Sequence, residues 1–133
     1  MKSALKITLI VLVSSLIGCD KPVKQEKPLY DQVMDIHDEV MPKMNDLYKL
    51  RKQLQDSIAN TADIPEEEKM EMEQTILQLD SASNSMMVWM REFNPPDQKD
   101  KDAFQKYMES ELVKVKKMRE DVMWALDKAK VQN

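Results

Sequence analysis

Two short stretches of the sequence carry side chains that can bind a metal ion. HDEVMPKM (residues 37–44) contains the only histidine of the chain, and MMVWMR (residues 86–91) is rich in methionine. Imidazole nitrogen and thioether sulfur are soft ligands that suit Cu(I). The same residue types also suit a plain hydrophobic core, because methionine fills irregular gaps between helices and its sulfur packs well against aromatic rings. We favour core packing and keep a metal site as the alternative, with these candidate ligands: Met34, His37, Met41, Met86, Met87 and Met90.

The sequence offers little for catalysis. With one histidine and one cysteine, neither a Ser-His-Asp nor a Cys-His arrangement can be assembled with confidence. A ferritin-type di-iron centre needs Glu-x-x-His on two helices, but the residue three positions before His37 is Met34. The only glycine is Gly18, so phosphate-cradling loops are improbable in the rest of the chain. We therefore expect no enzymatic activity and no cofactor.

The N-terminal residues have the pattern of a bacterial lipoprotein signal. Two lysines precede the apolar run ITLIVLVSSLI, and LIGC follows it. We predict that residues 1–18 are a signal peptide, cleaved after Gly18, and that Cys19 receives a lipid with acyl chains such as palmitate. The alternative is an N-terminal membrane anchor that is retained, with Cys19 as a free thiol.

Residues 19–28 should form a short flexible tether, because DKPVKQEKP is polar, contains two prolines and has no apolar period. Removing the two lysines of the signal peptide leaves 18 basic residues against 24 acidic ones, a net charge of −6. Such a charge disfavours binding to nucleic acid. Acyl chains would hold the protein on a membrane surface, the inner or the outer membrane, facing the periplasm or the exterior.

Residues 29–133 should form an all-α domain. Apolar residues recur in steps of three and four, which is typical of helices, and predict helices at about 29–59, 64–93 and 97–131. Similar lengths and short connections favour an antiparallel three-helix bundle with coiled-coil-like packing. The alternative is a helical hairpin or a longer coiled coil that completes its core by dimerising.

A few residues should bend, begin or end these helices. Pro42 should kink the first helix, and because the apolar row stays in phase across it, we expect a bend rather than a break. Asp63 should cap the second helix, and NPP (residues 94–96) should end it. Glu111 interrupts the apolar stripe of the third helix.

In an antiparallel bundle the two methionine-containing stretches come together. A turn near residues 61–62 pairs positions so that His37 lies level with Met86 and Met87, and Met34 lies level with Met90. We call the end of the bundle at which the first helix starts the tether end, and we expect both stretches to lie there.

Three stretches carry a resemblance to a known group of proteins. With LIGC, IHDEVMPKM (residues 36–44) and MMVWMREFN (residues 86–94), the chain resembles small lipoproteins of Bacteroidota that are often labelled viral A-type inclusion proteins. The resemblance covers most of the chain after the predicted cleavage site. It implies an anchored helical protein of unknown function and supplies no catalytic residues.

We predict a lipid-anchored helical interaction or structural module of the bacterial cell envelope. Its partner would be a protein or a second copy of the chain, besides the membrane that holds the lipid. The alternative is binding of Cu(I) or of a small hydrophobic molecule by the methionine and histidine side chains. The candidate residues for a partner-binding surface at the tether end are His37, Pro42, Met86, Trp89, Met90, Arg91 and Phe93.

Overall fold

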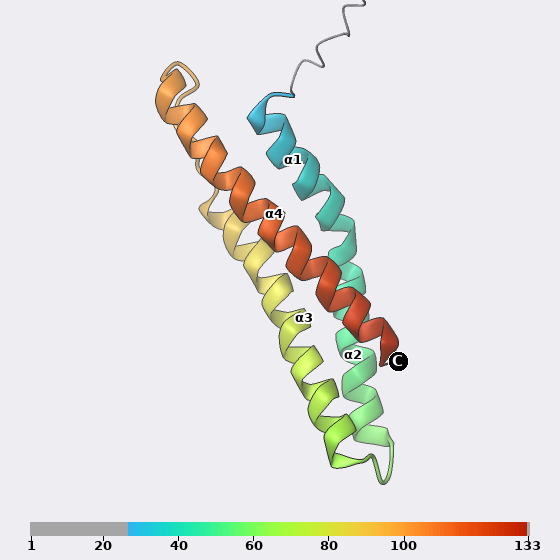
Figure 1. Ribbon diagram of the computed structural model, residues 1–133. Helices are drawn as coiled ribbons and strands as arrows, with labels where there is room; N and C mark the ends of the chain where they lie inside the picture. Colours follow the sequence, from blue (N-terminus) through green and yellow to red (C-terminus); the bar gives the residue numbers. More distant parts are fainter. Residues whose placement is uncertain (1–26, 133) are drawn as a thin grey trace, which may run out of the picture.

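The computed structural model describes residues 27–132, all of whose long elements are helices (Figure 1). The predicted signal peptide, Cys19 and most of the predicted tether lie outside the described residues. Within residues 27–132, no helix is long and apolar enough to cross a membrane. The all-α prediction is confirmed. The elements are α1 (Leu29–Val40), a 3₁₀ turn (Met41–Lys43), α2 (Met44–Asn60), α3 (Glu66–Glu92) and α4 (Lys101–Val131).

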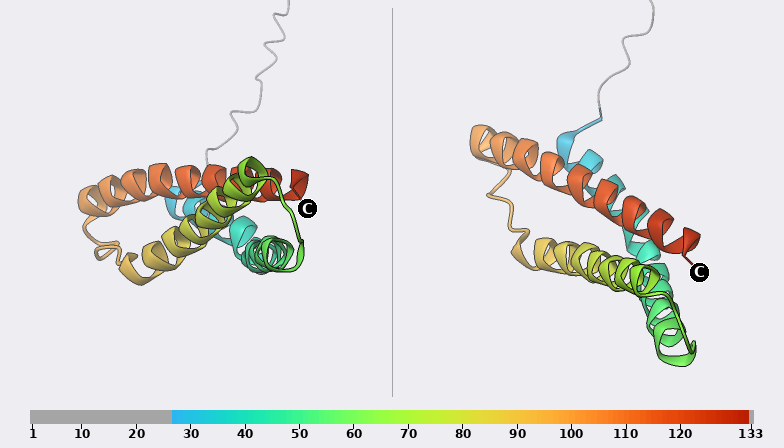
Figure 2. Two further views of the ribbon diagram at one scale, coloured as in Figure 1. Left: turned by 90° about the horizontal axis from the view of Figure 1, so that it is seen from below. Right: turned by 60° about the horizontal axis from the view of Figure 1, so that its bottom comes forward.

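The helices form a three-membered bundle, as predicted. α1 and α2 follow one another as a single bent rod, α3 runs back in the opposite direction, and α4 runs parallel to the rod (Figures 1 and 2). α4 packs against α1, α2 and α3, and α2 also packs against α3. The tether end therefore holds the start of α1, the end of α3 and the start of α4.

The bend between α1 and α2 lies at Pro42. This residue follows a last helical turn in which the Met41 N–H still bonds the His37 carbonyl, and the backbone remains in the helical region from Val40 to Met44. Proline supplies no N–H and crowds the preceding turn, which tightens three residues into a 3₁₀ turn. The first expected helix is thus bent and not broken, as predicted.

The connection between α2 and α3 differs from expectation. The prediction that Asp63 caps α3 is wrong, because the N-cap position is Pro65 and no side chain bonds to the helix start there. Asp63 instead adopts a positive φ of 66°. The left-handed region is costly for most residues but tolerated by aspartate, so Asp63 makes the turn that glycine usually makes.

The start of α4 also differs from expectation. The helix begins at Lys101, four residues later than the expected 97, and Asp100 is its N-cap. The Asp100 Oδ1 accepts a hydrogen bond from the backbone N–H of Ala103 at 3.1 Å. A carboxylate in this position accepts a hydrogen bond from an otherwise unpaired N–H of the first turn. Its negative charge also interacts favourably with the positive end of the helix dipole.

The core runs the full length of the bundle along one seam. The apolar row expected for the first helix is confirmed, since Val33, Val40, Leu47 and Leu54 are almost completely buried. A second row of the same helix, with Tyr30, Met34, Met41, Met44 and Tyr48, has the spacing of a buried row as well, but Tyr48 is 58 % exposed. The other side chains that are almost fully buried are Thr75, Leu79, Met86, Met108, Val115 and Val122.

The face that α3 turns to the core is one residue away from the expected one. In the sequence, a heptad pattern runs through Met72, Leu79 and Met86, and its second set of positions is Ile76, Ser83 and Met90. This second set is only partly buried. The positions one residue earlier, Thr75, Ala82 and Trp89, are buried instead. This rotation places the indole of Trp89 inside the bundle.

Candidate functional site

The structure brings the two methionine-containing stretches together at the tether end. His37 on α1 places Nε2 at 3.3 Å from the Sδ of Met90 on α3, although the two residues are 53 positions apart. Its other ring nitrogen, Nδ1, lies 2.9 Å from the Oδ1 of Asp38. The ring centroids of His37 and Trp89 are 6.0 Å apart. The predicted convergence is confirmed, and the half-buried His37 side chain is still 19 % exposed.

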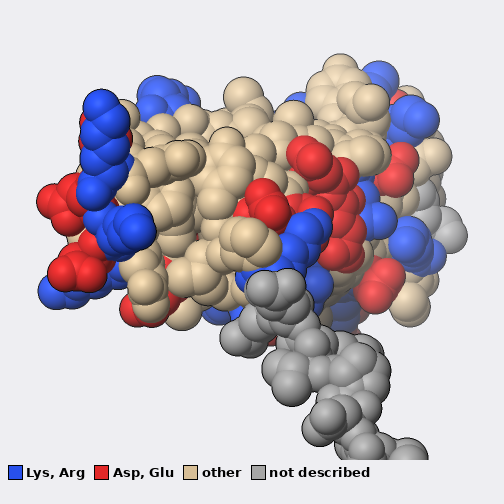
Figure 3. Space-filling view, turned by 90° about the horizontal axis from the view of Figure 1, so that it is seen from above, with Lys and Arg blue, Asp and Glu red and all other residues tan. Residues whose placement is uncertain are grey.

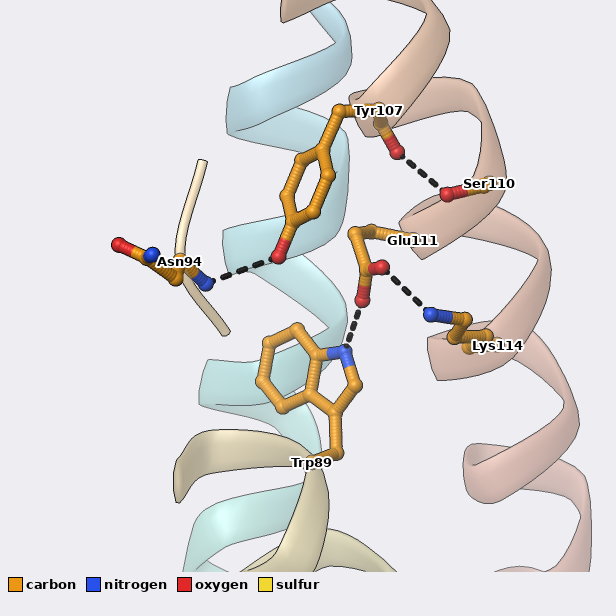
Figure 4. A network of polar contacts seen from close by, with 6 residues as sticks. All are labelled: Trp89, Asn94, Tyr107, Ser110, Glu111 and Lys114. Atoms are coloured by element: carbon orange, nitrogen blue, oxygen red, sulfur yellow. Dashed lines mark hydrogen bonds and ion pairs between the residues drawn. The ribbon is translucent and has the colours of Figure 1, made fainter. Parts of the chain in front are cut away.

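A buried hydrogen-bonded pair supports this end of the bundle (Figure 4). Trp89 Nε1 donates to Glu111 Oε2 at 2.6 Å, and Lys114 Nζ donates to Glu111 Oε1 at 2.7 Å. Glu111 is only 2 % exposed, whereas the Lys114 side chain reaches solvent. The hydrogen bond to Glu111 raises the pKa of Lys114 above 10.5, and partial burial of the ammonium opposes that shift. A buried carboxylate needs such partners, because an unpaired charge inside a protein is very costly.

An aromatic cluster surrounds Phe93, the residue that follows α3. Its ring centroid lies 4.9 Å from that of Trp89, 6.0 Å from Tyr107 and 6.5 Å from Tyr30. All three pairs are tilted, an arrangement that aromatic rings favour. The Tyr107 hydroxyl also accepts a hydrogen bond from the backbone N–H of Asn94 at 2.8 Å (Figure 4). The cluster thereby fixes the end of α3 and the start of the α3–α4 connection.

The candidate surface residues divide into a buried and an accessible group. Met86 is completely buried and Trp89 is 7 % exposed, so neither side chain is available to a partner in this structure. Arg91 and Pro42 are exposed, and Phe93 is partly buried against the core.

The candidate metal ligands also differ in exposure. Met34, Met41 and Met90 are partly buried, Met87 is 47 % exposed, and Met86 belongs to the core. Nowhere in residues 27–132 do three or more His, Cys, Asp or Glu side chains group as metal ligands would. A metal site at the tether end would therefore depend on imidazole and thioether groups.

A groove of about 380 Å³ lies beside this site, between the start of α1 and the start of α4. Figure 3 looks onto the tether end, where uncharged side chains cover much of the middle of the face and charged ones gather toward both sides. The residues that line the groove are Lys27, Pro28, Leu29, Gln32, Gln98, Lys101, Phe104, Gln105 and Met108.

Sequence reasoning missed the role of Glu111. Its interruption of the apolar stripe was visible, but the stripe continues in phase through Met108, Glu111, Val115 and Met118, all of which are buried. A carboxylate in a core position requires a donor on a facing helix. The indole N–H of Trp89 is such a donor, so the sequence could have suggested Trp89 as the partner of Glu111.

Comparisons of the chain with protein-family models, with curated proteins and with solved structures found no match. The resemblance to small lipoproteins of Bacteroidota stays a prediction.

Proposed function

We propose that this chain is a lipid-anchored interaction module of the bacterial cell envelope, which binds a protein partner through its tether end. The observation that carries the proposal is the meeting of the two sequence motifs at this end, where exposed Arg91 stands two positions before Phe93 of the partly exposed aromatic cluster. Arginine and aromatic side chains are the commonest anchors of protein interfaces.

The aromatic cluster would present a rigid surface to a partner. Phe93 contacts the rings of Trp89, Tyr107 and Tyr30, so few of its rotamers remain free. A side chain that is already ordered loses less conformational entropy on binding than a mobile one. Trp89 in this proposal supports Phe93 from below and is not itself a contact residue.

The groove between α1 and α4 would add apolar contact area. Leu29, Phe104 and Met108 line it, and Lys27 and Lys101 stand at the same groove. Pockets of a few hundred Å³ with apolar walls and a few polar groups are typical of binding sites. An apolar side chain or short segment of the partner fits such a groove.

The predicted lipid anchor restricts where the partner is found. Eight positions separate Cys19 from Lys27, the first described residue. A fully extended chain spans roughly 3.3–3.6 Å per residue, so the tether end stays within about 30 Å of the lipid. The proposed partner is therefore a protein that comes within this distance of the membrane, such as a membrane protein or a second copy of this chain.

A photo-crosslinking amino acid at Arg91 tests the surface in living cells. Glu67 is the matched control, because it is also exposed and on α3 but lies 24 positions away, about 36 Å along the helix. We expect one discrete adduct from position 91 and none from position 67. Equal adducts from both positions, or no adduct from position 91, would contradict the proposal.

The anchor is tested separately by metabolic labelling with palmitate. We expect the wild-type chain to incorporate the label and Cys19→Ser to lose it completely, because Cys19 is the only cysteine. Label that persists in Cys19→Ser, or that is absent from the wild type, would remove the lipid anchor from the account.

A further inference from the structure

We propose that His37 and Met90 bind one Cu(I) ion at the tether end, with Met41 as a third ligand. The site joins α1 to α3 through His37 Nε2 and Met90 Sδ, which are 3.3 Å apart. This role goes beyond the proposed partner binding and does not depend on it.

The hydrogen bonding of the imidazole provides the first argument. In a neutral ring only one of the two nitrogens carries a proton. The contact of 2.9 Å between Nδ1 and the Asp38 carboxylate places that proton on Nδ1, since a carboxylate only accepts. In this neutral tautomer Nε2 carries a lone pair, and it lies 3.3 Å from the Met90 sulfur, which has lone pairs of its own. A cation that both atoms can bind turns this unfavourable contact into a favourable one.

A metal-binding histidine commonly has this arrangement. Such histidines usually donate their second ring N–H to a carboxylate or a carbonyl, which fixes the tautomer and makes the metal-binding nitrogen more basic. Asp38 occupies this position relative to His37. The Asp38 carboxylate is well exposed, so placing it beside the imidazole carries little desolvation cost.

The distance between the two ligand atoms provides the second argument. Metal–nitrogen bonds are roughly 2.0 Å and metal–sulfur bonds about 2.3 Å for ions of this size. Atoms 3.3 Å apart then subtend an angle of about 100° at a shared ion. This angle leaves room for at least one further ligand, and thioether and imidazole ligands together select Cu(I) over harder ions.

Met41 is the best-placed third ligand. It follows His37 by four positions, which puts the two residues on the same face of the helix, and long helical side chains lean toward the preceding turn. Met41 is partly buried against the core, as is Met90, and the His37 side chain is partly exposed. An ion can therefore reach the site from solvent while its ligands stay ordered. Met86 is fully buried and takes no part.

Competition with a chromogenic Cu(I) chelator under anaerobic conditions measures binding to the full chain. All variants carry Cys19→Ser, because the only thiol of the sequence would otherwise compete for the ion. We expect one Cu(I) per chain and affinity at least about tenfold lower for both His37→Ala and Met90→Leu, since ligand and supporting residues typically contribute 10–100-fold. Asp38→Ala, at an exposed side chain, should weaken binding by a similar factor. Met70→Leu is the control, because Met70 is 60 % exposed at the opposite end of α3.

Tryptophan fluorescence gives a second readout that locates the ion. In a Trp124→Phe background the signal comes from Trp89 alone, whose ring lies 6.0 Å from His37. Titration with Ag(I), an air-stable soft ion of the same charge, should change this signal up to one equivalent, and His37→Ala should abolish the change. Helix content by circular dichroism confirms that each variant is folded.

The proposal is overturned if the wild-type chain binds no stoichiometric Cu(I), or if His37→Ala and Met90→Leu bind it as tightly as Met70→Leu. In either case a second ring proton, on Nε2, and not a metal satisfies the contact with the Met90 sulfur. Unchanged affinity in Met41→Leu would remove Met41 from the site.

Discussion

Replacing Trp89 by phenylalanine should destabilise the bundle chiefly because it deprives Glu111 of a hydrogen-bond donor. Glu111 is 2 % exposed, and within residues 27–132 it receives hydrogen bonds from Trp89 and from Lys114. Phenylalanine keeps the aromatic packing but has no N–H, so one carboxylate oxygen is left buried without a partner.

The expected size of the effect follows from general values for buried groups. Losing a hydrogen bond to a charged group costs about 1.5–3 kcal/mol, and the smaller ring adds roughly 1 kcal/mol for the space it leaves. We therefore expect Trp89→Phe to lower the free energy of unfolding by about 2.5–4 kcal/mol. Glu111→Leu should lower the free energy of unfolding by about 2 kcal/mol, because the indole N–H of Trp89 then lacks an acceptor. Lys114 contributes little to either value, since its side chain is 60 % exposed.

The double variant provides the decisive comparison. Removing both polar partners leaves an apolar contact, and such replacements are often nearly neutral. Trp89→Phe/Glu111→Leu should therefore be only about 1–2 kcal/mol less stable than the wild type, far less than the sum of the single changes. The coupling energy from this double-mutant cycle should be about 3.5–4 kcal/mol.

Urea unfolding followed by circular dichroism measures all four chains without relying on tryptophan fluorescence. A change of 3 kcal/mol shifts the midpoint by roughly 1–3 M for a domain of this size, which is easily resolved. If the double variant loses as much free energy of unfolding as the two single variants together, the two side chains are not coupled. The buried hydrogen bond between Trp89 and Glu111 would then not be a source of stability.

Three further changes test local features of the fold by the same urea measurement. Asp100→Ala should cost about 1 kcal/mol because it removes the cap of α4, while Asp100→Asn should be nearly neutral; an equal loss in both would contradict the capping role. Asp63→Val should be about 1–2 kcal/mol less stable than Asp63→Gly, because φ at this residue is positive; equal stability would argue against the left-handed turn. The pKa of Lys114 is raised in the folded chain, so its contribution is complete below pH 10.5 and is lost as the pH rises through the raised value. Wild type should therefore lose more stability than Lys114→Met between about pH 9 and about pH 12, and identical losses would refute the assigned cause.

Most of the fold could be predicted from the sequence because it depends on a repeating apolar pattern. The spacing of Val33, Val40, Leu47 and Leu54 is enough to place the first two helices, and Pro42 is enough to place the bend. Helix starts were less predictable, since Asp63 and Asp100 are equally good capping residues by type. Which of them caps a helix depends on how the connection returns to the bundle.

The candidate site was only partly predictable, because its details depend on which face of α3 meets the core. Two series of positions, one ending at Met90 and one at Trp89, both fit a period of seven. The structure buries the second series, and the reason lies in a partner far along the chain, the carboxylate of Glu111. The meeting of the two stretches was predicted from the antiparallel arrangement, but His37 was placed level with Met86 and Met87 and not with Met90. The contacts of His37 with Met90 and with Asp38 were therefore not predicted.

Both functional proposals require the two motifs to meet at the tether end, and a nuclear Overhauser effect between His37 and Met90 measures this directly. In a chain labelled at the methionine methyl groups, a cross-peak should join the Met90 methyl to the ring protons of His37, since Sδ and Nε2 are 3.3 Å apart. The cross-peak should vanish in Met90→Leu and persist in Met70→Leu. Assigned His37 and Met90 signals without any cross-peak between them would contradict the account.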